Sequence, residues 1–287
     1  MKQTIRYTRS ADGTALAWAS AGDGPPLVRA ANWLTHLEYD LESPIWRPHI
    51  DRLSERYTLL RMDERACGLS DADVEISFEA WVRDLEALVD AAGLERFALY
   101  GASQGAPIAV EYAVRHPERV SHLFILGGYA RGFKRRGHPP ERIEEMDAQL
   151  KLVRQGWGRE EGSYRKMFAM QFAPRATMEQ IDSMSELQRR TCTPENAVRI
   201  MEAMFNIDVT EAASQVKCPT LLVTGEFDPL CPLEDAVEAF SDLKVPKEMW
   251  VFENQYHPLW GIANLGGMDC HDYVLDWLQA LFSGKRK

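Results

Sequence analysis

The chain has 287 residues, of which 45% are hydrophobic and 26% are charged, as is typical of a globular protein with one large core. Lysine and arginine total 33 against 43 acidic residues, so the formal net charge is −10. This sign is opposite to that of a typical nucleic-acid-binding protein, and we expect no nucleic-acid partner. One basic run, residues 131–136, stands against the trend and is interpreted as a solvated loop.

The five cysteines are odd in number, and no two of them have the spacing of a CxxC motif. This pattern favours free thiols in a reducing compartment. The first residues lack the apolar core of a signal peptide, and no apolar run approaches the roughly 20 residues that a membrane-spanning helix requires. We therefore expect a cytoplasmic protein without a membrane segment. The sequence carries no signal for its oligomeric state.

Short runs rich in apolar and β-branched residues alternate with amphipathic runs along most of the chain. The strand candidates are residues 4–8, 15–19, 27–30, 57–62, 97–100, 123–126, 220–224 and 249–252. Several of them are apolar throughout, which is typical of strands covered by helices on both faces. The pattern predicts an α/β protein with a mostly parallel, eight-stranded sheet flanked by helices.

Helical patterns fill the intervals between these runs. Ser77 can cap a helix that reaches about residue 92, another helix follows Ser103, and a terminal helix carries apolar residues on one face between 273 and 281. The alternation stops between 129 and 210, where only helical patterns occur. We expect residues 129–210 to be an inserted helical cap, and residues 1–128 and 211–287 to form the core.

Methionine is concentrated in the expected cap, which holds seven of the eleven methionines. Most of them are expected to fill space between helices. A few, such as Met170, are expected to form an adaptable apolar wall above a binding site.

A serine stands between two glycines in Gly101-Ala102-Ser103-Gln104-Gly105, after an apolar run and before a helical run. A serine hydroxyl is a weak nucleophile that needs exposure, a base and donors for an oxyanion. The strand–turn–helix context supplies the exposure, and the start of the helix supplies unpaired N–H groups. Glycines at both ends avoid a collision with neighbouring backbone. We therefore predict that Ser103 is a nucleophile.

An acid and a histidine follow this serine in the order that such a turn requires. Asp228 comes after an apolar strand that ends at Gly225, and His257 comes after the last predicted strand. Parallel sheets place their active sites at this edge. Glu226 is the competing acid, and His271 is the competing base. We predict that Asp228 orients His257, and that His257 is the general base.

These motifs resemble those of the α/β-hydrolase superfamily, and most closely its esterase, haloperoxidase-like and proline-iminopeptidase-like branch with a helical cap. The resemblance rests on the serine turn, on Gly225-x-x-Asp228, on His257 and on residues 63–71. The last segment is similar to the family's DxRGxGxS loop, with Ala66 in place of a glycine. The resemblance implies a Ser-His-Asp triad and an acyl-enzyme intermediate.

The resemblance also implies an oxyanion hole made of two backbone N–H groups. One belongs to Gln104, the residue after the nucleophile. The other follows a His-Gly pair in the family, and Ala31-Asn32 replace that pair here. Trp33 would then donate the second N–H. The missing glycine restricts the loop, so the identity of this donor stays open.

Aromatic and apolar residues near these segments favour a bulky hydrophobic ester or lactone as substrate. The expected contacts are Asn32, Leu34, His36, Met170 and Trp260. An acidic chain with a large cap is compatible with a cationic amphiphile such as an amino-sugar macrolactone antibiotic. We expect neither a metal nor another cofactor, because no cluster has metal-ligand spacing and no glycine-rich phosphate loop is present.

Other chemistry on the same triad stays open. Carbon–carbon bond hydrolysis, perhydrolysis or cleavage of a peptide or amide bond would use the same three residues. A ligand receptor without catalysis is a further alternative, although a receptor has no need for an intact Ser103, His257 and Asp228.

Overall fold

The computed structural model of the chain describes residues 2–241, 243–253, 256–257, 276–277 and 280. Its centre is an eight-stranded sheet with the order β1-β2-β4-β3-β5-β6-β7-β8. The strands are β1 Thr4–Arg9, β2 Ala15–Ala21, β3 Pro26–Arg29, β4 Thr58–Met62, β5 Phe97–Ala102, β6 Val120–Leu126, β7 Thr220–Gly225 and β8 Lys247–Phe252. The predicted fold class is confirmed: β2 is antiparallel to its neighbours β1 and β4, and the six strands from β4 to β8 are parallel.

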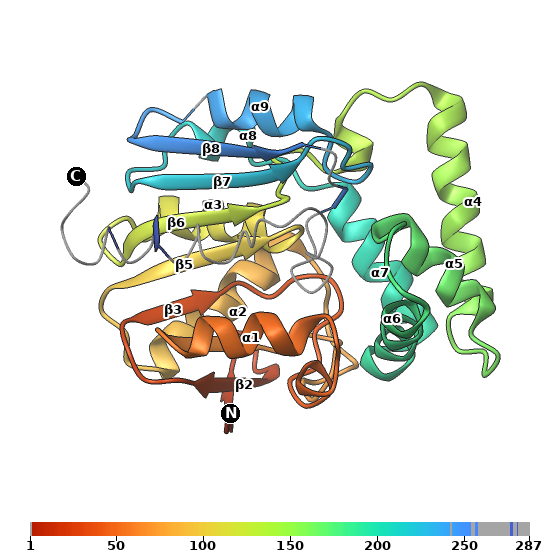
Figure 1. Cartoon of the computed structure of the whole chain (residues 1–287), viewed down its shortest axis with the longest axis horizontal. Coiled ribbons are helices and arrows are strands. Elements are labelled where there is room, and N and C mark those ends of the chain that lie inside the picture. Colours follow the sequence, from red (N-terminus) through yellow and green to blue (C-terminus); the bar gives the residue numbers. More distant parts are fainter. Residues whose placement is uncertain (1, 242, 254–255, 258–275, 278–279, 281–287) are drawn as a thin grey trace.

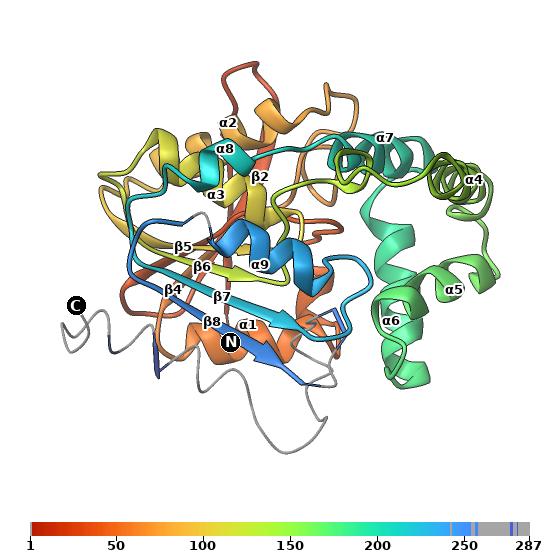
Figure 2. The same cartoon turned by 90° about the horizontal axis from the view of Figure 1, so that it is seen from above.

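Helices pack on both faces of the sheet, with α2, α3 and α8 on one face and α1 on the other (Figure 2). The helices are α1 Trp46–Ser54, α2 Phe78–Ala91, α3 Gly105–Arg115, α4 Pro140–Gly156, α5 Ser163–Phe172, α6 Met178–Thr191, α7 Pro194–Phe205, α8 Thr210–Ala213 and α9 Leu233–Ser241. As predicted, Ser77 caps α2 through its side chain. Short 3-10 turns lie at Tyr39–Leu41 and Phe133–Arg135.

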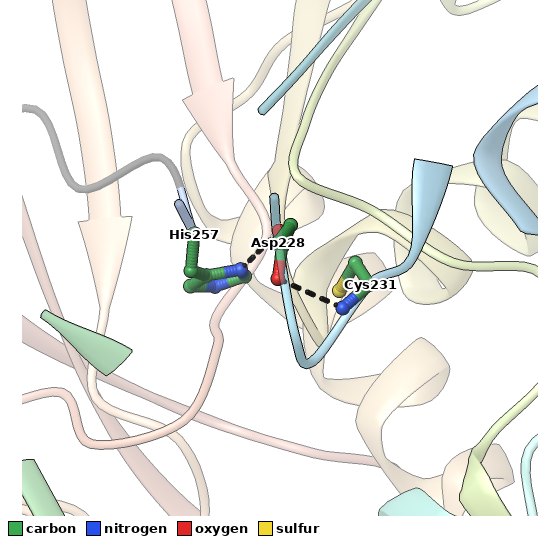
Figure 3. A group of neighbouring side chains, drawn as sticks. All are labelled: Asp228, Cys231 and His257. Atoms are coloured by element: carbon green, nitrogen blue, oxygen red, sulfur yellow. Dashed lines mark hydrogen bonds and ion pairs between the residues drawn. The ribbon is translucent and has the colours of Figure 1, made fainter. Parts of the chain in front are cut away.

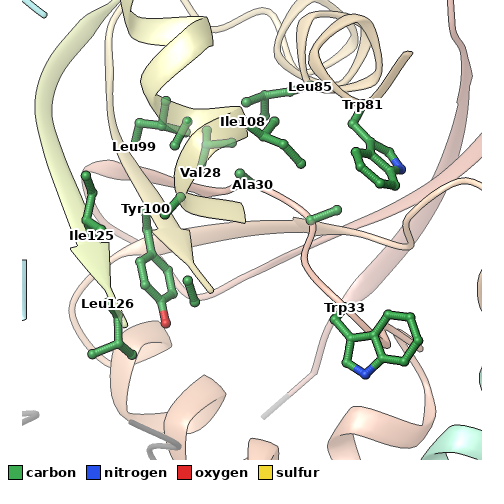
Figure 4. Close-up of a cluster of buried hydrophobic side chains, with 14 of the residues drawn as sticks. Val28, Ala30, Trp33, Trp81, Leu85, Leu99, Tyr100, Ile108, Ile125 and Leu126 are labelled. Carbon is green, nitrogen blue, oxygen red and sulfur yellow. The ribbon is translucent and has the colours of Figure 1, made fainter. Parts of the chain in front are cut away.

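The burial of the strands follows from this layering. Every residue of β5 and β7 is buried, because helices cover both faces of the middle of the sheet. The edge strand β1 is half-buried or exposed along its whole length. Figure 4 shows how Val28, Leu99 and Ile125 of adjacent strands meet Leu85 and Ile108 from the covering helices. Burial of these side chains is the main source of stability for the core.

Helices α4 to α7 lie between β6 and β7 in the chain and stand beyond the ends toward which the parallel strands point (Figure 1). They begin at the sequence signals expected of them. Thr177 and Gln180 form a capping box at the start of α6, and Thr193 caps α7 in front of Pro194. The assignment of residues 129–210 as a cap stays a prediction about their role.

Among the described residues, none of the helices has the length and apolar character that crossing a bilayer requires.

Candidate active site

Ser103 lies at the turn between β5 and α3. Its φ of +48° is in the left-handed region, which residues other than glycine rarely adopt. A Cβ on Gly101 would lie 2.6 Å from the carbonyl oxygen of Gly105, and a Cβ on Gly105 would lie 3.0 Å from that of Ala30. The two glycines therefore allow a close packing of strand, helix and loop. This geometry holds the serine at a sharp, strained turn.

Gln104 is the N-cap residue of α3, and its side chain is fully buried. The first N–H groups of a helix have no acceptor within the helix, and the positive end of the helix dipole lies at the same place. An oxyanion next to Ser103 would meet this end of α3. The role of the Gln104 N–H in an oxyanion hole stays a prediction.

Asp228 and His257 are hydrogen-bonded, with Nδ1 of His257 2.7 Å from Oδ2 of Asp228 (Figure 3). The other carboxylate oxygen, Oδ1, accepts hydrogen bonds from the N–H groups of Leu230 and Cys231, both at 2.9 Å. Both side chains of the pair are buried. The loop after β7 thus fixes the carboxylate, and the carboxylate fixes the imidazole ring. Their catalytic roles stay a prediction, as does that of Ser103.

Glu226, the competing acid, is half-buried, and its N–H donates to the carbonyl oxygen of Phe252. No hydrogen bond or ion pair joins its carboxylate to His257 among the contacts of the described residues. His271, the competing base, lies outside the described residues. The carboxylate that meets His257 is therefore the one that chain order favours.

Cys231 lies three residues after Asp228 and is a neighbour that the sequence motifs did not single out. Its thiol and the ligand atoms of Asp228 and His257 lie within 4.8 Å of one another, which is compact enough for a metal ion (Figure 3). Burial and then the charge of Asp228 raise the pKa of the Cys231 thiol well above its usual value. The Asp228–His257 hydrogen bond already occupies Oδ2 and Nδ1, and the N–H groups of Leu230 and Cys231 occupy Oδ1. The arrangement fits proton transfer better than metal binding.

The loop that would supply the second oxyanion donor is held from two sides. The buried Asn32 accepts a hydrogen bond from Arg29 and donates one to the carbonyl oxygen of Trp33. Arg29 stacks on the ring of Trp46 at 4.8 Å. Asn32 therefore fixes the loop through its amide where the family has a glycine. Leu34, with a φ of +62°, takes the left-handed conformation one residue after Trp33.

The loop of residues 63–71 is hydrogen-bonded to the segment that follows Leu34. Oδ1 of Asp63 accepts the N–H of Leu37 and Oδ2 accepts the N–H of Leu69, each at 2.8 Å. Burial raises the pKa of Asp63 to about 7. Ala66, which replaces the family's glycine, has a φ of +67° and so keeps the backbone shape that a glycine would adopt without strain.

Glu64 is a buried acid behind the serine turn whose part the sequence did not indicate. Both of its carboxylate oxygens and both polar atoms of the Gln104 side chain lack a hydrogen-bond partner among the described residues. Burial raises the pKa of Glu64 to about 8, and the nearby Gln104 and Trp81 side chains offset part of this rise. The two side chains are thus close enough to interact without forming a hydrogen bond. A neutral Glu64 fits this apolar position.

Two cavities open at Ser103. The smaller, of about 50 Å³, is lined by Ser103 and His257 together with Asn32, Leu34 and Phe172 among others. The larger, of about 370 Å³, runs from Trp33 and Ser103 toward α4 and α7 and is mostly apolar. The rings of Trp33 and Phe168, 6.4 Å apart between centroids, both line it, so the expected cap and the core share its wall. Ser103 and His257 therefore face a common space.

The other residues predicted to contact substrate divide into two groups. Asn32 and Leu34 line the smaller cavity. His36 and Met170 are not among the residues that line either cavity, and Met170 is 45% exposed. Trp260 lies outside the described residues. The placement of His36 and Met170 reflects turns of the loop and of α5 that residue spacing does not specify.

Known proteins are similar to this chain in sequence or in fold. The chain is 28% identical over 194 residues to a RutD protein of Azorhizobium caulinodans, to which carbamate hydrolase activity is ascribed, and the match covers 65% of this chain and 69% of that protein. An esterase of Exiguobacterium antarcticum superposes with a TM-score of 0.79 at 20% identity, over 96% of this chain and all of that one. An enol-lactonase of Burkholderia xenovorans superposes with a TM-score of 0.69 at 21% identity, over 96% and 100%.

These structural similarities fall below 25% identity and establish the fold alone. The family assignment rests on the sequence, because the model of the alpha/beta hydrolase fold matches residues 40–259, more than half of the chain. The predicted resemblance is thereby confirmed. This chain belongs to the alpha/beta hydrolase fold family.

Proposed function

We propose that this protein is a serine hydrolase that cleaves a carboxylic ester or lactone of a hydrophobic small molecule. Ser103 is the nucleophile, His257 the general base and Asp228 the acid that orients it. The observation that carries the proposal is the buried 2.7 Å hydrogen bond between Asp228 and His257, beside a cavity that Ser103 also lines.

The reaction follows from these contacts. Asp228 accepts the Nδ1–H of His257, which leaves Nε2 unprotonated and able to take the proton of the Ser103 hydroxyl. Ser103 attacks the carbonyl carbon, and the N–H groups of Gln104 and Trp33 stabilise the oxyanion. His257 then gives its proton to the leaving alcohol. Water, activated by His257 in turn, cleaves the acyl-enzyme and regenerates Ser103.

The larger cavity supports an apolar substrate. Phe168 and Phe172 of α5 and Met201 and Met204 of α7 line it, so we propose that residues 129–210 act as the cap over the binding site. A cationic macrolactone is not favoured by this lining. Among its described residues the charged ones are arginines, Arg136 and Arg142, and none is acidic.

The test is hydrolysis of p-nitrophenyl butyrate and of an aliphatic lactone, each followed by mass spectrometry in H₂¹⁸O. One ¹⁸O atom in the carboxylate product is expected, through the acyl-enzyme. Ser103→Ala should lower kcat by about 10⁵-fold or more, by comparison with other serine hydrolases. Hydrolysis that persists in Ser103→Ala would assign the reaction to another group. Binding of both esters without turnover would favour the receptor alternative.

A further inference from the structure

The larger cavity, which is otherwise mostly apolar, has basic residues in its lining. Arg136 and Arg142 line it, and they are the charged residues among the described ones that do so. Positive charge here is unexpected in a chain with a net charge of −10. For Arg136 alone, the interpretation of residues 131–136 as a solvated loop was wrong, because its side chain is only 7% exposed.

Arg136 is held in place by neighbouring backbone. Its Nη1 donates to the carbonyl oxygen of Leu230 at 2.9 Å, its Nε donates to that of Arg131 at 2.8 Å, and the same Nε lies 2.8 Å from Asp235. The guanidinium stacks at 5.5 Å on the ring of Tyr129. These contacts use Nε and Nη1, and among the described residues no hydrogen bond engages Nη2. A fixed guanidinium of this kind loses little conformational freedom when it binds an anion.

Arg142 reaches the same cavity from α4. It lies 5.9 Å from the ring of Phe133, and its partner is Glu145 on the surface, in a pair whose side chains are 51% and 60% exposed. Such an exposed ion pair contributes little, so a ligand anion can compete for the guanidinium. The ring of His138 lies 4.3 Å from that of Phe133 between centroids. Burial and then the charges of Arg136 and Arg142 lower the pKa of His138.

We infer that Arg136 and Arg142 bind a carboxylate of the substrate in the cavity that Ser103 also lines, separate from the bond that Ser103 cleaves. This inference rests on the proposed function and names the substrate class: a monoester or lactone with an apolar middle and a free carboxylate. Each arginine already has one acidic partner, Asp235 or Glu145. Neither acid is among the residues that line the cavity, so the guanidinium groups are the charged groups that would meet a ligand there. Because each arginine is already balanced by one acid, a monoanion is favoured over a dianionic phosphate, and a planar guanidinium fits a carboxylate.

The test compares two matched substrate series. One series consists of monomethyl esters of linear dicarboxylic acids with five to ten carbons, and the other of the corresponding methyl ester monoamides, which are neutral and similar in shape. We expect kcat/KM to favour the acid over the amide by about tenfold at one chain length, as for one charge-assisted hydrogen bond at a partly exposed site. Equal kcat/KM values across both series would overturn the inference.

Variants locate the effect. Arg142→Gln should lower kcat/KM for the preferred acid by about tenfold and leave the amide within about twofold. Arg154→Gln removes the same charge from an exposed position of α4 outside the cavity lining and should change neither substrate. Arg136→Lys keeps the positive charge but removes the planar guanidinium with its forked donors. A melting curve checks that this variant folds. A loss in Arg154→Gln equal to that in Arg142→Gln would show a long-range charge effect and contradict a subsite.

Two readouts distinguish a failure of the carboxylate subsite from a failure of the proposed function. Turnover of p-nitrophenyl butyrate, which has no carboxylate, reports the function of Ser103 alone. Calorimetric titration with the monoamide of the preferred dicarboxylic acid reports carboxylate binding alone. Binding that Arg142→Gln weakens and Arg154→Gln does not would support the subsite even without turnover, and the absence of binding at millimolar ligand would refute it.

Discussion

The imidazole of His257 and the carboxylate of Asp228 are joined by a buried 2.7 Å hydrogen bond, although 29 residues separate them in the chain. The carboxylate has no freedom to turn away, because its second oxygen accepts N–H groups from Leu230 and Cys231. A fixed acceptor at Nδ1 selects the tautomer in which Nε2 can accept a proton. The hydrogen bond thus suits the ring to the role of general base that we propose for it.

Asp228→Asn should lower kcat by about 10⁴-fold, because an amide can donate to Nδ1 and so stabilise the wrong tautomer. Steady-state hydrolysis of p-nitrophenyl butyrate measures the loss. Glu226→Gln is the matched control on the same loop, and we expect it to retain activity within about threefold, as for a residue outside the transition state. If Asp228→Asn kept full activity and Glu226→Gln were inactive, Glu226 rather than Asp228 would be the acid that orients His257.

Gly101→Ala should destabilise the serine turn. The new Cβ would lie 2.6 Å from the carbonyl oxygen of Gly105 and 2.7 Å from the Cα of Ala106, and backbone at such distances has to move. We expect a loss of about 1–3 kcal/mol in the free energy of unfolding, measured by urea denaturation. The control is Gly158→Ala, whose Cβ would lie 3.4 Å from Pro194. Equal stabilities of the two variants would mean that the turn is less tightly packed than described.

Glu64→Gln should remove part of the pH dependence of stability. The pKa of Glu64 is raised to about 8 in the folded state from an ordinary value of 4.5. An acid whose pKa is higher in the folded than in the unfolded state contributes stability that is present below pH 4.5 and is lost as the pH rises through about 8. The free energy of unfolding of the native chain should therefore fall between pH 5 and 9. Glutamine has the shape of the protonated acid and should flatten this slope.

Other ionisable groups near Glu64 also affect the pH dependence of the free energy of unfolding. The carboxylate of Asp84 opposes its ionisation, and the guanidinium of Arg65 favours it. Asp63, whose pKa is raised to about 7, adds a slope of the same sign that Glu64→Gln leaves in place. Glu95→Gln, at an exposed position, is the control. A Glu64→Gln variant with the slope of the native chain would show that Glu64 is ionised in the folded protein.

The fold was predictable because its signals are local. Apolar runs such as residues 220–224 identify strands that lie under helices, and caps such as Ser77 and Thr177 mark where helices begin. The ends of strands were less accurate: β2 extends to Ala21 and β8 begins at Lys247. The position of β4 between β2 and β3 depends on long-range pairing, which the pattern of one strand does not contain.

The site was predictable as far as chain order and a sharp turn specify it. Ser103, Asp228 and His257 each follow a strand of one parallel sheet, and the ends of such strands converge. Glu64 and Arg136 were missed for the opposite reason. Whether a charged residue is buried depends on what packs over it, here the Gln104 side chain and the chain segment around Leu230. The basic run was a signal for Arg136, but its interpretation as a solvated loop was wrong for this residue.

The most direct test of the account is the reaction of the purified protein with a fluorophosphonate, which labels only an activated serine. Intact mass measures the stoichiometry, and peptide mapping locates the adduct, with Ser103→Ala as the control. We predict one adduct per chain, on Ser103, and none in the variant. An unlabelled native protein that still binds the probe reversibly, or an adduct that persists in Ser103→Ala, would contradict Ser103 as the nucleophile.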